Sequence, residues 1–310
     1  MAGGQSLAAY ILRRLGWLVV VLLIIATASF FLMRFAPGGP FDKERNLPEA
    51  IEKNLRAKYH LDKPLWKQYF IYMGGLFQGD LGPSFKYRNR TVNEIIAESF
   101  PVSAMLGLYA LSLAIIVGVA TGTLAALKKH TAFDFAAMSV AMLGISLPNF
   151  FLGLILLLIF CFKLPLLPAG GWGGPDHLVL PVLSLAAPFT AYIARLTRVS
   201  MLEVLSQPYI RTARAKGLTE FRVVTRHALK NAITPVVSYL GPAAAAVLTG
   251  SVVVEKIFAI PGLGSHFVNA ALNRDYTLVM GTVLLYSLLL VLFNLMVDII
   301  YFFTDPRVRL

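Results

Sequence analysis

The sequence predicts an all-α integral membrane protein with six membrane-spanning helices, on three observations. Of the 310 residues, 57% are hydrophobic and 14% are charged, whereas about a quarter of the residues of a soluble domain are charged. Six apolar runs approach or exceed the length of about 20 residues that a helix needs to cross the hydrocarbon core. These runs are continuous, so they lack the ten-residue alternation typical of a membrane β-barrel.

The six expected spans are residues 17–33, 101–127, 135–162, 178–194, 232–254 and 278–303. Each is expected to be helical, because an isolated strand would leave backbone groups unpaired in lipid. The first span is interpreted as an uncleaved anchor, since the RFAPGGP that follows it lacks a small-residue cleavage site. Six prolines lie in the spans; they are Pro101, Pro148, Pro181, Pro188, Pro235 and Pro242. They predict kinks that suit a bundle that changes shape, and the alternative is that proline is simply frequent in membrane helices. Gly118 and Gly122 have the small-xxx-small spacing that lets two helices approach closely.

The long segment 34–100 is predicted to form a small, partly helical cap on the outer face. Helical periodicity is visible at 50–59 and at 92–99, and glycines and prolines such as GDLGPS interrupt the segment. Its role is open between a structural cap and a docking surface for an external partner.

The distribution of basic residues predicts that both termini are cytoplasmic. With that topology, fourteen Lys and Arg residues lie inside and three lie in the short outer loops, while 34–100 holds eleven together with eight acids. Cytoplasmic loops carry the excess of positive charge, and long loops are largely exempt from this rule. Topology therefore explains much of the net charge of +12, and a nucleic-acid partner is not expected.

The sequence lacks the residue patterns of a catalytic or metal site. All five histidines lie outside the apolar runs, and the absence of a Gly-Lys dipeptide excludes a Walker A loop. No metal and no cofactor are expected on this chain, and the single Cys161 is interpreted as a packing residue. Asp298 lies inside a run and Glu255 at the edge of another. Intramembrane acids are functional candidates, so Asp298 is open between a structural ion pair and a role in a transport cycle.

The cytoplasmic segment 195–231 carries eight Lys and Arg residues. Its pattern predicts a short helix over 209–216, a stop at Gly217 and a second helix over 221–231 that leads into the next span. Basic residues in the last turn of the first helix suit the negative end of its dipole. A short helix held away from the bilayer by two helical arms has a shape suited to docking in a partner's groove. The alternative is a basic loop held against anionic lipid.

The stretch YIRTARAKGL resembles the cytoplasmic signature of the peptide/nickel branch of ABC importer permeases. The general importer pattern is Glu-Ala-Ala, three residues, Gly, nine residues, then Ile-x-Leu-Pro. Ala213, Gly217 and Leu229 keep that pattern, whereas Arg211-Thr212 replace Glu-Ala, and His227 and Lys230 replace Ile and Pro. The resemblance extends over nearly the whole chain, including GGWGG, TGSVVVEKIFAIPGLGSHFVNAALNRDYTLVMG and DPRVR. FKYRNRTV and ALNRDYTLVMG are most similar to the oligopeptide importers.

This resemblance implies the type I ABC importer permease fold, a location in the bacterial cytoplasmic (inner) membrane and a transporter subunit that is not itself an enzyme. The implied partners are a second homologous permease, two ATPase subunits that bind ATP and magnesium, an external peptide-binding protein and the peptide substrate. The implied coupling helix comprises Tyr209, Ile210, Arg211, Thr212, Ala213, Arg214, Ala215, Lys216, Gly217 and Leu218.

Polar residues in the spans are the candidates for the substrate pathway, because a permissive peptide pathway needs scattered polar groups. They are Ser146, Asn149, Thr249, Ser251 and Asn294. The alternative for each is a role in helix packing or in pairing backbone groups left free within a span. The predicted organisation is a cytoplasmic N-terminus and first span (1–33), an outer region (34–100), a transmembrane core (101–303) that contains the loop 195–231, and a cytoplasmic tail (304–310). The alternatives are a dipeptide, nickel-chelate or oligosaccharide permease of the same architecture, an ion-driven carrier, or an intramembrane enzyme.

Overall fold

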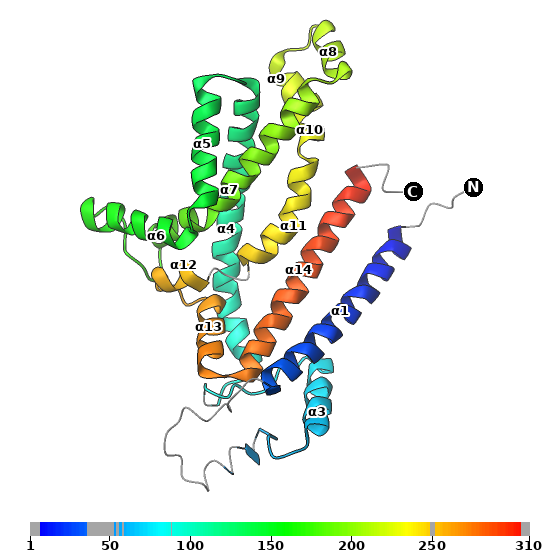
Figure 1. Ribbon diagram of the computed structural model, residues 1–310, viewed down its shortest axis with the longest axis vertical. Helices are drawn as coiled ribbons and strands as arrows, with labels where there is room; N and C mark the ends of the chain where they lie inside the picture. Colours follow the sequence, from blue (N-terminus) through cyan, green and yellow to red (C-terminus); the bar gives the residue numbers. More distant parts are fainter. Residues whose placement is uncertain are drawn as a thin grey trace.

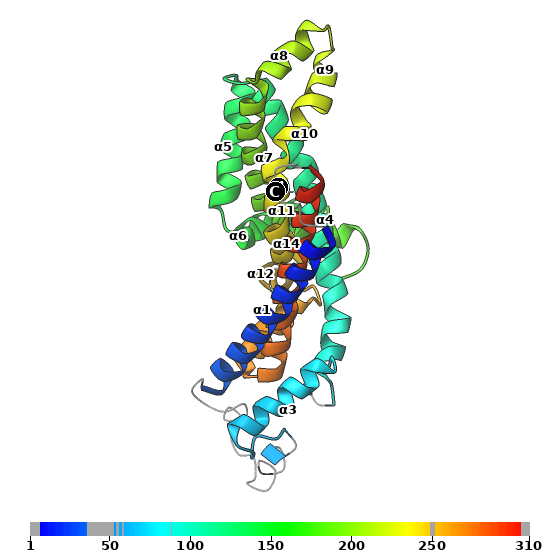
Figure 2. The same ribbon diagram turned by 90° about the vertical axis from the view of Figure 1, so that its right-hand side faces the viewer.

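A computed structural model describes residues 7–35, 53, 56–57, 59–87, 89–248 and 252–304. Within these residues the protein is built from helices, and the only pairing of extended backbone is an isolated bridge between Pro83 and Thr91. The molecule is elongated, with α8 (Pro208–Ala215) at one end and α3 (Leu65–Phe77) towards the other (Figures 1 and 2).

Five segments are long and apolar enough to cross a membrane in the described part of the chain. They are Ile11–Phe35 in α1 (Leu7–Phe35), Val92–Leu127 (α4), Asp176–Leu205 (α7), Thr234–Ile257 and Tyr276–Ile300 in α14 (Tyr276–Thr304). The fourth comprises α11 (Thr234–Leu248) and α12 (Val252–Ile257), which flank residues 249–251. These segments match five of the six predicted spans.

The remaining predicted span, 135–162, is not one continuous helix. It divides into α5 (Ala132–Ser146) and the pair α6 (Asn149–Leu157) and η1 (Leu158–Lys163), with a bend of 104° between them. The residue before a proline avoids the helical region, and Leu147 has extended backbone before Pro148 (φ −83°, ψ 128°). With the bent pair counted as one span, the protein has up to six.

The core lies where α4 crosses α7. Leu106, Ala110 and Ala114 of α4 are fully buried against Leu185 and Ile193 of α7. Gly118 and Gly122 on α4 allow its backbone to approach α7 closely. A Cβ at Gly118 would lie 2.9 Å from the Thr190 carbonyl oxygen, and one at Gly122 would lie 2.7 Å from Thr197 Cβ. The small-residue prediction is therefore confirmed.

The outer region differs from its prediction in two ways. The helical pattern at 92–99 is the start of α4, which begins at a capping box formed by Thr91 and Glu94. The pattern at 50–59 lies mostly outside the described residues, and α3 is a helix that was not predicted. Asp275 joins this region to α14, because its carboxylate accepts hydrogen bonds from the Ser84 hydroxyl and from the Phe85 backbone N–H (3.1 Å).

Two helical arms carry the segment 195–231. α7 continues eleven residues beyond the predicted end at 194, and its 30 residues are about 45 Å of helix, more than the hydrocarbon core of about 30 Å requires. The returning arm contains α9 (Glu220–Arg222), the π-helical turn η2 (Val223–Ala228) and α10 (Leu229–Ala232). The predicted helix over 221–231 lies within this arm.

Candidate functional site

α8 is a short, separate helix at the tip of the two arms (Figure 1). It begins at Pro208, directly after Gln207, whose backbone is extended (ψ 147°). Proline suits the first position of a helix, where its missing N–H has no intrahelical acceptor. The predicted helix 209–216 is thus confirmed, with a shift of one residue at each end.

Gly217 ends α8 through backbone geometry. Its φ is +77°, its N–H donates to the Arg214 carbonyl (2.9 Å), and the Leu218 N–H donates to the Ala213 carbonyl (3.4 Å). These two bonds form a Schellman motif, in which glycine is favoured because left-handed backbone is strained for other residues. A Cβ on Gly217 would meet no atom within 4 Å, so the requirement is conformational and not one of space within this chain.

The inner face of α8 is anchored in an apolar cluster. Ile210 is fully buried and Ala213 is 6% exposed. They pack with Met201 of α7 and with Val223 and Ala228 of η2. An eight-residue helix is marginal in isolation, so this cluster holds α8 in place.

The opposite face of α8 is polar and exposed. Its exposed members are Tyr209, Arg211, Thr212, Arg214 and Ala215, and the exposed Lys216 and Gly217 follow directly after the helix. Arg214 forms an ion pair with Glu220 (2.8 Å), and Asn231 Nδ2 donates to the Tyr209 hydroxyl (2.8 Å). These contacts fasten α8 to the returning arm. Arg211 and Lys216 have no ion-pair partner among the described residues, so the free face carries net positive charge.

An ion pair that sequence reasoning missed connects α5 to α7 below this tip. Arg198 Nε lies 2.5 Å from Asp134 Oδ1, and Arg198 Nη2 lies 2.7 Å from Asp134 Oδ2. Asp134 also accepts from the His130 backbone N–H (3.0 Å). The predicted span began at residue 135, so Asp134 was counted as loop. An acidic residue three positions after Thr131 is a helix-start signal that could have extended the span.

The two acids that the sequence singled out both have partners. Asp298 forms an ion pair with Arg14 of α1 (2.9 Å), which favours the structural interpretation. Glu255 is fully buried, and its carboxylate accepts from the Ser103 hydroxyl (2.7 Å) and from the Ser265 N–H (3.3 Å). Glu255 therefore joins α12 to α4 and α13 (Leu263–Asn273).

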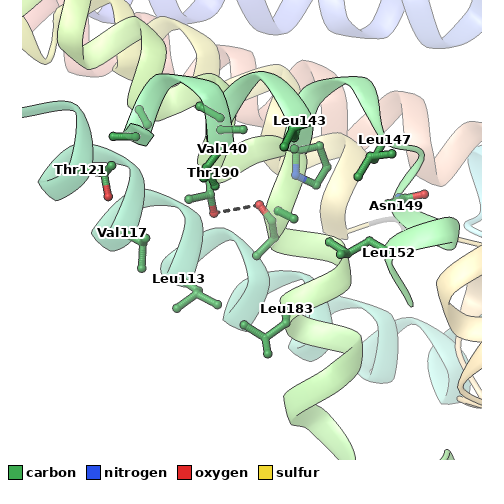
Figure 3. Close-up of a pocket in the computed structure, with 18 of the residues that line it drawn as sticks. Leu113, Val117, Thr121, Val140, Leu143, Leu147, Asn149, Leu152, Leu183 and Thr190 are labelled. Atoms are coloured by element: carbon green, nitrogen blue, oxygen red, sulfur yellow. Dashed lines mark hydrogen bonds between the residues drawn. The ribbon is translucent and has the colours of Figure 1, made fainter. Parts of the chain in front are cut away.

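The pathway candidates do not converge on one described site. Asn149 lines a groove of about 500 Å³ between α4, α5, α6 and α7, together with mainly apolar side chains such as Leu113, Val140 and Leu183 (Figure 3). Ser146 is exposed at the α5–α6 bend, outside that lining. Asn294 lies at the crossing of α14 with α11, since its Oδ1 would be 2.7 Å from a Cβ at Gly241. Thr249 and Ser251 lie outside the described residues.

The fold and the site define a class: a multi-pass helical membrane protein that presents a basic helix beyond the ends of its spans. Residues 118–310 match the family described as "Binding-protein-dependent transport system inner membrane component", and residues 7–107 match the N-terminal component of the same systems. The chain belongs to this family of ABC importer permeases. The type I permease fold and the multi-pass inner membrane location predicted from the sequence are thereby confirmed.

Curated relatives cover the chain from end to end. It is 49% identical over 302 residues to the oligopeptide transport system permease protein OppB of Haemophilus influenzae, covering 97% of this chain and 99% of the relative. Identity and coverage are the same for OppB of Escherichia coli K12. The dipeptide transport system permease protein DppB of Bacillus subtilis is 47% identical over 304 residues, 98% of this chain and 99% of the relative. The inward-facing methionine transporter MetNI aligns with 69% of this chain and 95% of its own at 16% identity and a TM-score of 0.48, a likeness too low to support an argument.

Proposed function

We propose that this chain is the OppB-type permease subunit of an ATP-driven importer that takes up oligopeptides. The observation that carries the proposal is α8, a packed helix whose basic face is exposed at the tip of two arms. The near full-length similarity to OppB proteins supports peptides as the substrate. The comparable similarity to DppB favours dipeptides as the second candidate. A nickel-chelate or oligosaccharide permease of the same architecture, or an ion-driven carrier, would be a different outcome of the tests below.

The proposed transporter complex contains four further kinds of subunit. A second permease of the OppC type completes the translocation pathway, and two ATPases of the OppD and OppF types bind ATP and magnesium. An external OppA-type protein delivers the peptide. This chain binds no cofactor of its own in this scheme, and the absence of a Gly-Lys dipeptide supports placing nucleotide on the ATPases. Both termini lie in the cytoplasm, in agreement with the excess of Lys and Arg on that side.

The attachment of α8 to both arms allows movement of the ATPases to reach the membrane spans. ATP binding draws the two ATPases together, and the groove that holds α8 moves with its subunit. Ile210 and Ala213 tie α8 to both arms, so a displacement of α8 displaces α7 and the segment Glu220–Ala232 as a unit. The Arg198–Asp134 pair passes the same displacement to α5. The bend at Pro148 and the two prolines within α7 are then the points at which these helices change their angle.

Affinity purification of the tagged chain from its native membrane in mild detergent tests this proposal. Mass spectrometry is expected to find a second permease and two Walker A proteins with the wild-type chain. The variant Arg211→Glu is expected to lose the ATPases and retain the second permease, since it reverses charge only on the exposed face of α8. Glu203→Arg reverses charge on exposed α7 near α8 and serves as the control that retains all subunits. A chain that is recovered alone and still transports peptide would overturn the proposal.

A further inference from the structure

A pocket of about 260 Å³ lies at the end of the molecule opposite α8. It is formed where the last turns of α1 meet α3, the segment 80–85 and the first turns of α14. The two views place the end of α1, α3 and the start of α14 in one region (Figures 1 and 2). This pocket has no part in the proposed movement of α8 and the two arms.

A guanidinium group with incomplete hydrogen bonding lines the pocket. Arg34 lies over the rings of Phe30 and Tyr276, with its Cζ 5.2 Å and 5.7 Å from their centroids. Its Nε is buried and has no hydrogen-bond acceptor in the described part of the chain. Burying a hydrogen-bond donor without an acceptor costs free energy. The unpaired Nε therefore indicates that another molecule supplies an acceptor.

Two further orphaned polar atoms belong to side chains of the same pocket. Gln68 is 8% exposed, and its Nε2 donates to the Lys63 carbonyl (2.7 Å), whereas its buried Oε1 accepts from no described group. The Tyr72 hydroxyl is buried and has no described partner. Burial raises the pKa of Tyr72 to about 12, so the hydroxyl remains protonated and can donate. Among the six buried side-chain atoms without a partner in the described residues, three therefore belong to this pocket.

The pocket also holds an acid. Asp80 lines it and is exposed, and its Oδ1 accepts from the Gly82 N–H (2.8 Å). Arg34 and Tyr72 suit a phosphate, while Asp80 and Gln68 Oε1 suit an ammonium group. This combination of donors, acceptors and charges of both signs fits a ligand that is itself zwitterionic.

The surroundings of the pocket indicate lipid. α1 exposes apolar side chains next to Arg34, including Leu32 (71%) and Phe35 (73%). α3 exposes Trp66, Phe70 and Phe77. Trp is enriched at the depth of the lipid head groups, so Trp66 suits that position, and Phe70 and Phe77 add apolar surface beside it. α1 packs mainly against α14 at the edge of the bundle.

We propose that this pocket binds the head group of a zwitterionic amine phospholipid from the leaflet at the α3 end. The phosphate lies on Arg34 and Tyr72, and the ammonium lies between Gln68 and Asp80. The exposed aromatic side chains of α3 pack on the acyl chains. The bound lipid fixes α1 against α14 and the outer segment 80–85.

Native mass spectrometry of the full-length chain, purified with the subunits that accompany it, tests the proposal. The probes are phosphatidylethanolamine, phosphatidylglycerol, inorganic phosphate and a tripeptide. Phosphatidylethanolamine is expected to bind the wild type, and Arg34→Gln is expected to weaken that binding about tenfold or more, since a charge-assisted hydrogen bond is lost. Lys67→Gln makes the same change of charge at an exposed position of α3 and is expected to bind as the wild type does.

Two more variants keep the test decisive. Tyr72→Phe retains the ring and its packing on Phe30 (5.7 Å between centroids) and is expected to weaken binding of the lipid even if Arg34→Gln fails to fold. Asp80→Asn is expected to reduce the preference for phosphatidylethanolamine over phosphatidylglycerol. Equal lipid binding by the Tyr72→Phe, Arg34→Gln and Lys67→Gln proteins would overturn the proposal. So would displacement of the lipid by tripeptide or by inorganic phosphate, or equal affinity of the wild type for the two lipids.

Discussion

Replacing Ile210 by alanine should detach α8 from its base. Ile210 is fully buried, and an Ile→Ala change at such a site costs about 2–5 kcal/mol, because apolar contact is lost and a cavity remains. The remaining apolar anchors are Ala213 and the partly buried Leu218, and the remaining polar contacts, Arg214–Glu220 and Tyr209–Asn231, are exposed to water. Since α8 has only eight residues, its helical state depends on this packing. A loss of about 3 kcal/mol corresponds to a population of the detached state raised about a hundredfold.

Hydrogen–deuterium exchange of the purified protein measures this effect. The amides of residues 212–218 are expected to exchange much faster in Ile210→Ala than in the wild type, because local opening permits exchange. Ile193→Ala is the matched control, since Ile193 is also fully buried but lies in the core of the bundle. The control should lower overall stability without a selective effect on α8. Unchanged exchange in α8, or an equal increase in the Ile193→Ala protein, would refute the packing argument.

Three further outcomes are expected. Gly217→Ala should lower the free energy of unfolding, measured by chemical denaturation, by about 1 kcal/mol, because residue 217 has left-handed backbone. Gly217→Asn should lower it less, because asparagine tolerates that conformation. Gly118→Val should push α4 away from α7 and lower the Tm by several degrees, while Gly16→Val, where a Cβ meets nothing within 4 Å, should leave it unchanged. Burial and nearby Arg90 lower the pKa of His266, so the folded state binds fewer protons than the unfolded chain. The contribution of neutral His266 to the free energy of unfolding should be fully present above about pH 6.5 and should be lost as the pH falls through the pKa of the folded state. His266→Gln should remove this contribution, so the Tm of the variant should depend less on pH in that range.

The sequence predicted features that depend on local pattern and long apolar runs. The boundaries of α14, the short helix α8 and its stop at Gly217 follow from composition, helix-end chemistry and glycine's freedom at positive φ. α3 was missed because its apolar residues surround two consecutive glycines, Gly74 and Gly75, and their low helix propensity masks the pattern. A kink at Pro148 was predicted, but the division of the helix there was not, because hydropathy alone does not show whether a proline kinks a helix or divides it.

Contacts between distant residues were beyond the reach of the sequence. Asp134 and Arg198 are 64 positions apart, and Ser84 and Asp275 are 191 positions apart. A single sequence does not show which distant polar groups contact each other in the folded protein. For the same reason the polar pathway candidates were chosen by residue type, and the structure separates Asn149 from Asn294.

Site-specific photo-crosslinking in native membranes tests the central claim most directly. A photoreactive amino acid at Thr212, on the exposed face of α8, is expected to form an adduct with a Walker A ATPase. The same amino acid at Ile24, an exposed apolar position of α1, is expected to form none. An assembled, active importer that gives no ATPase adduct from position 212 would contradict α8 as the coupling helix.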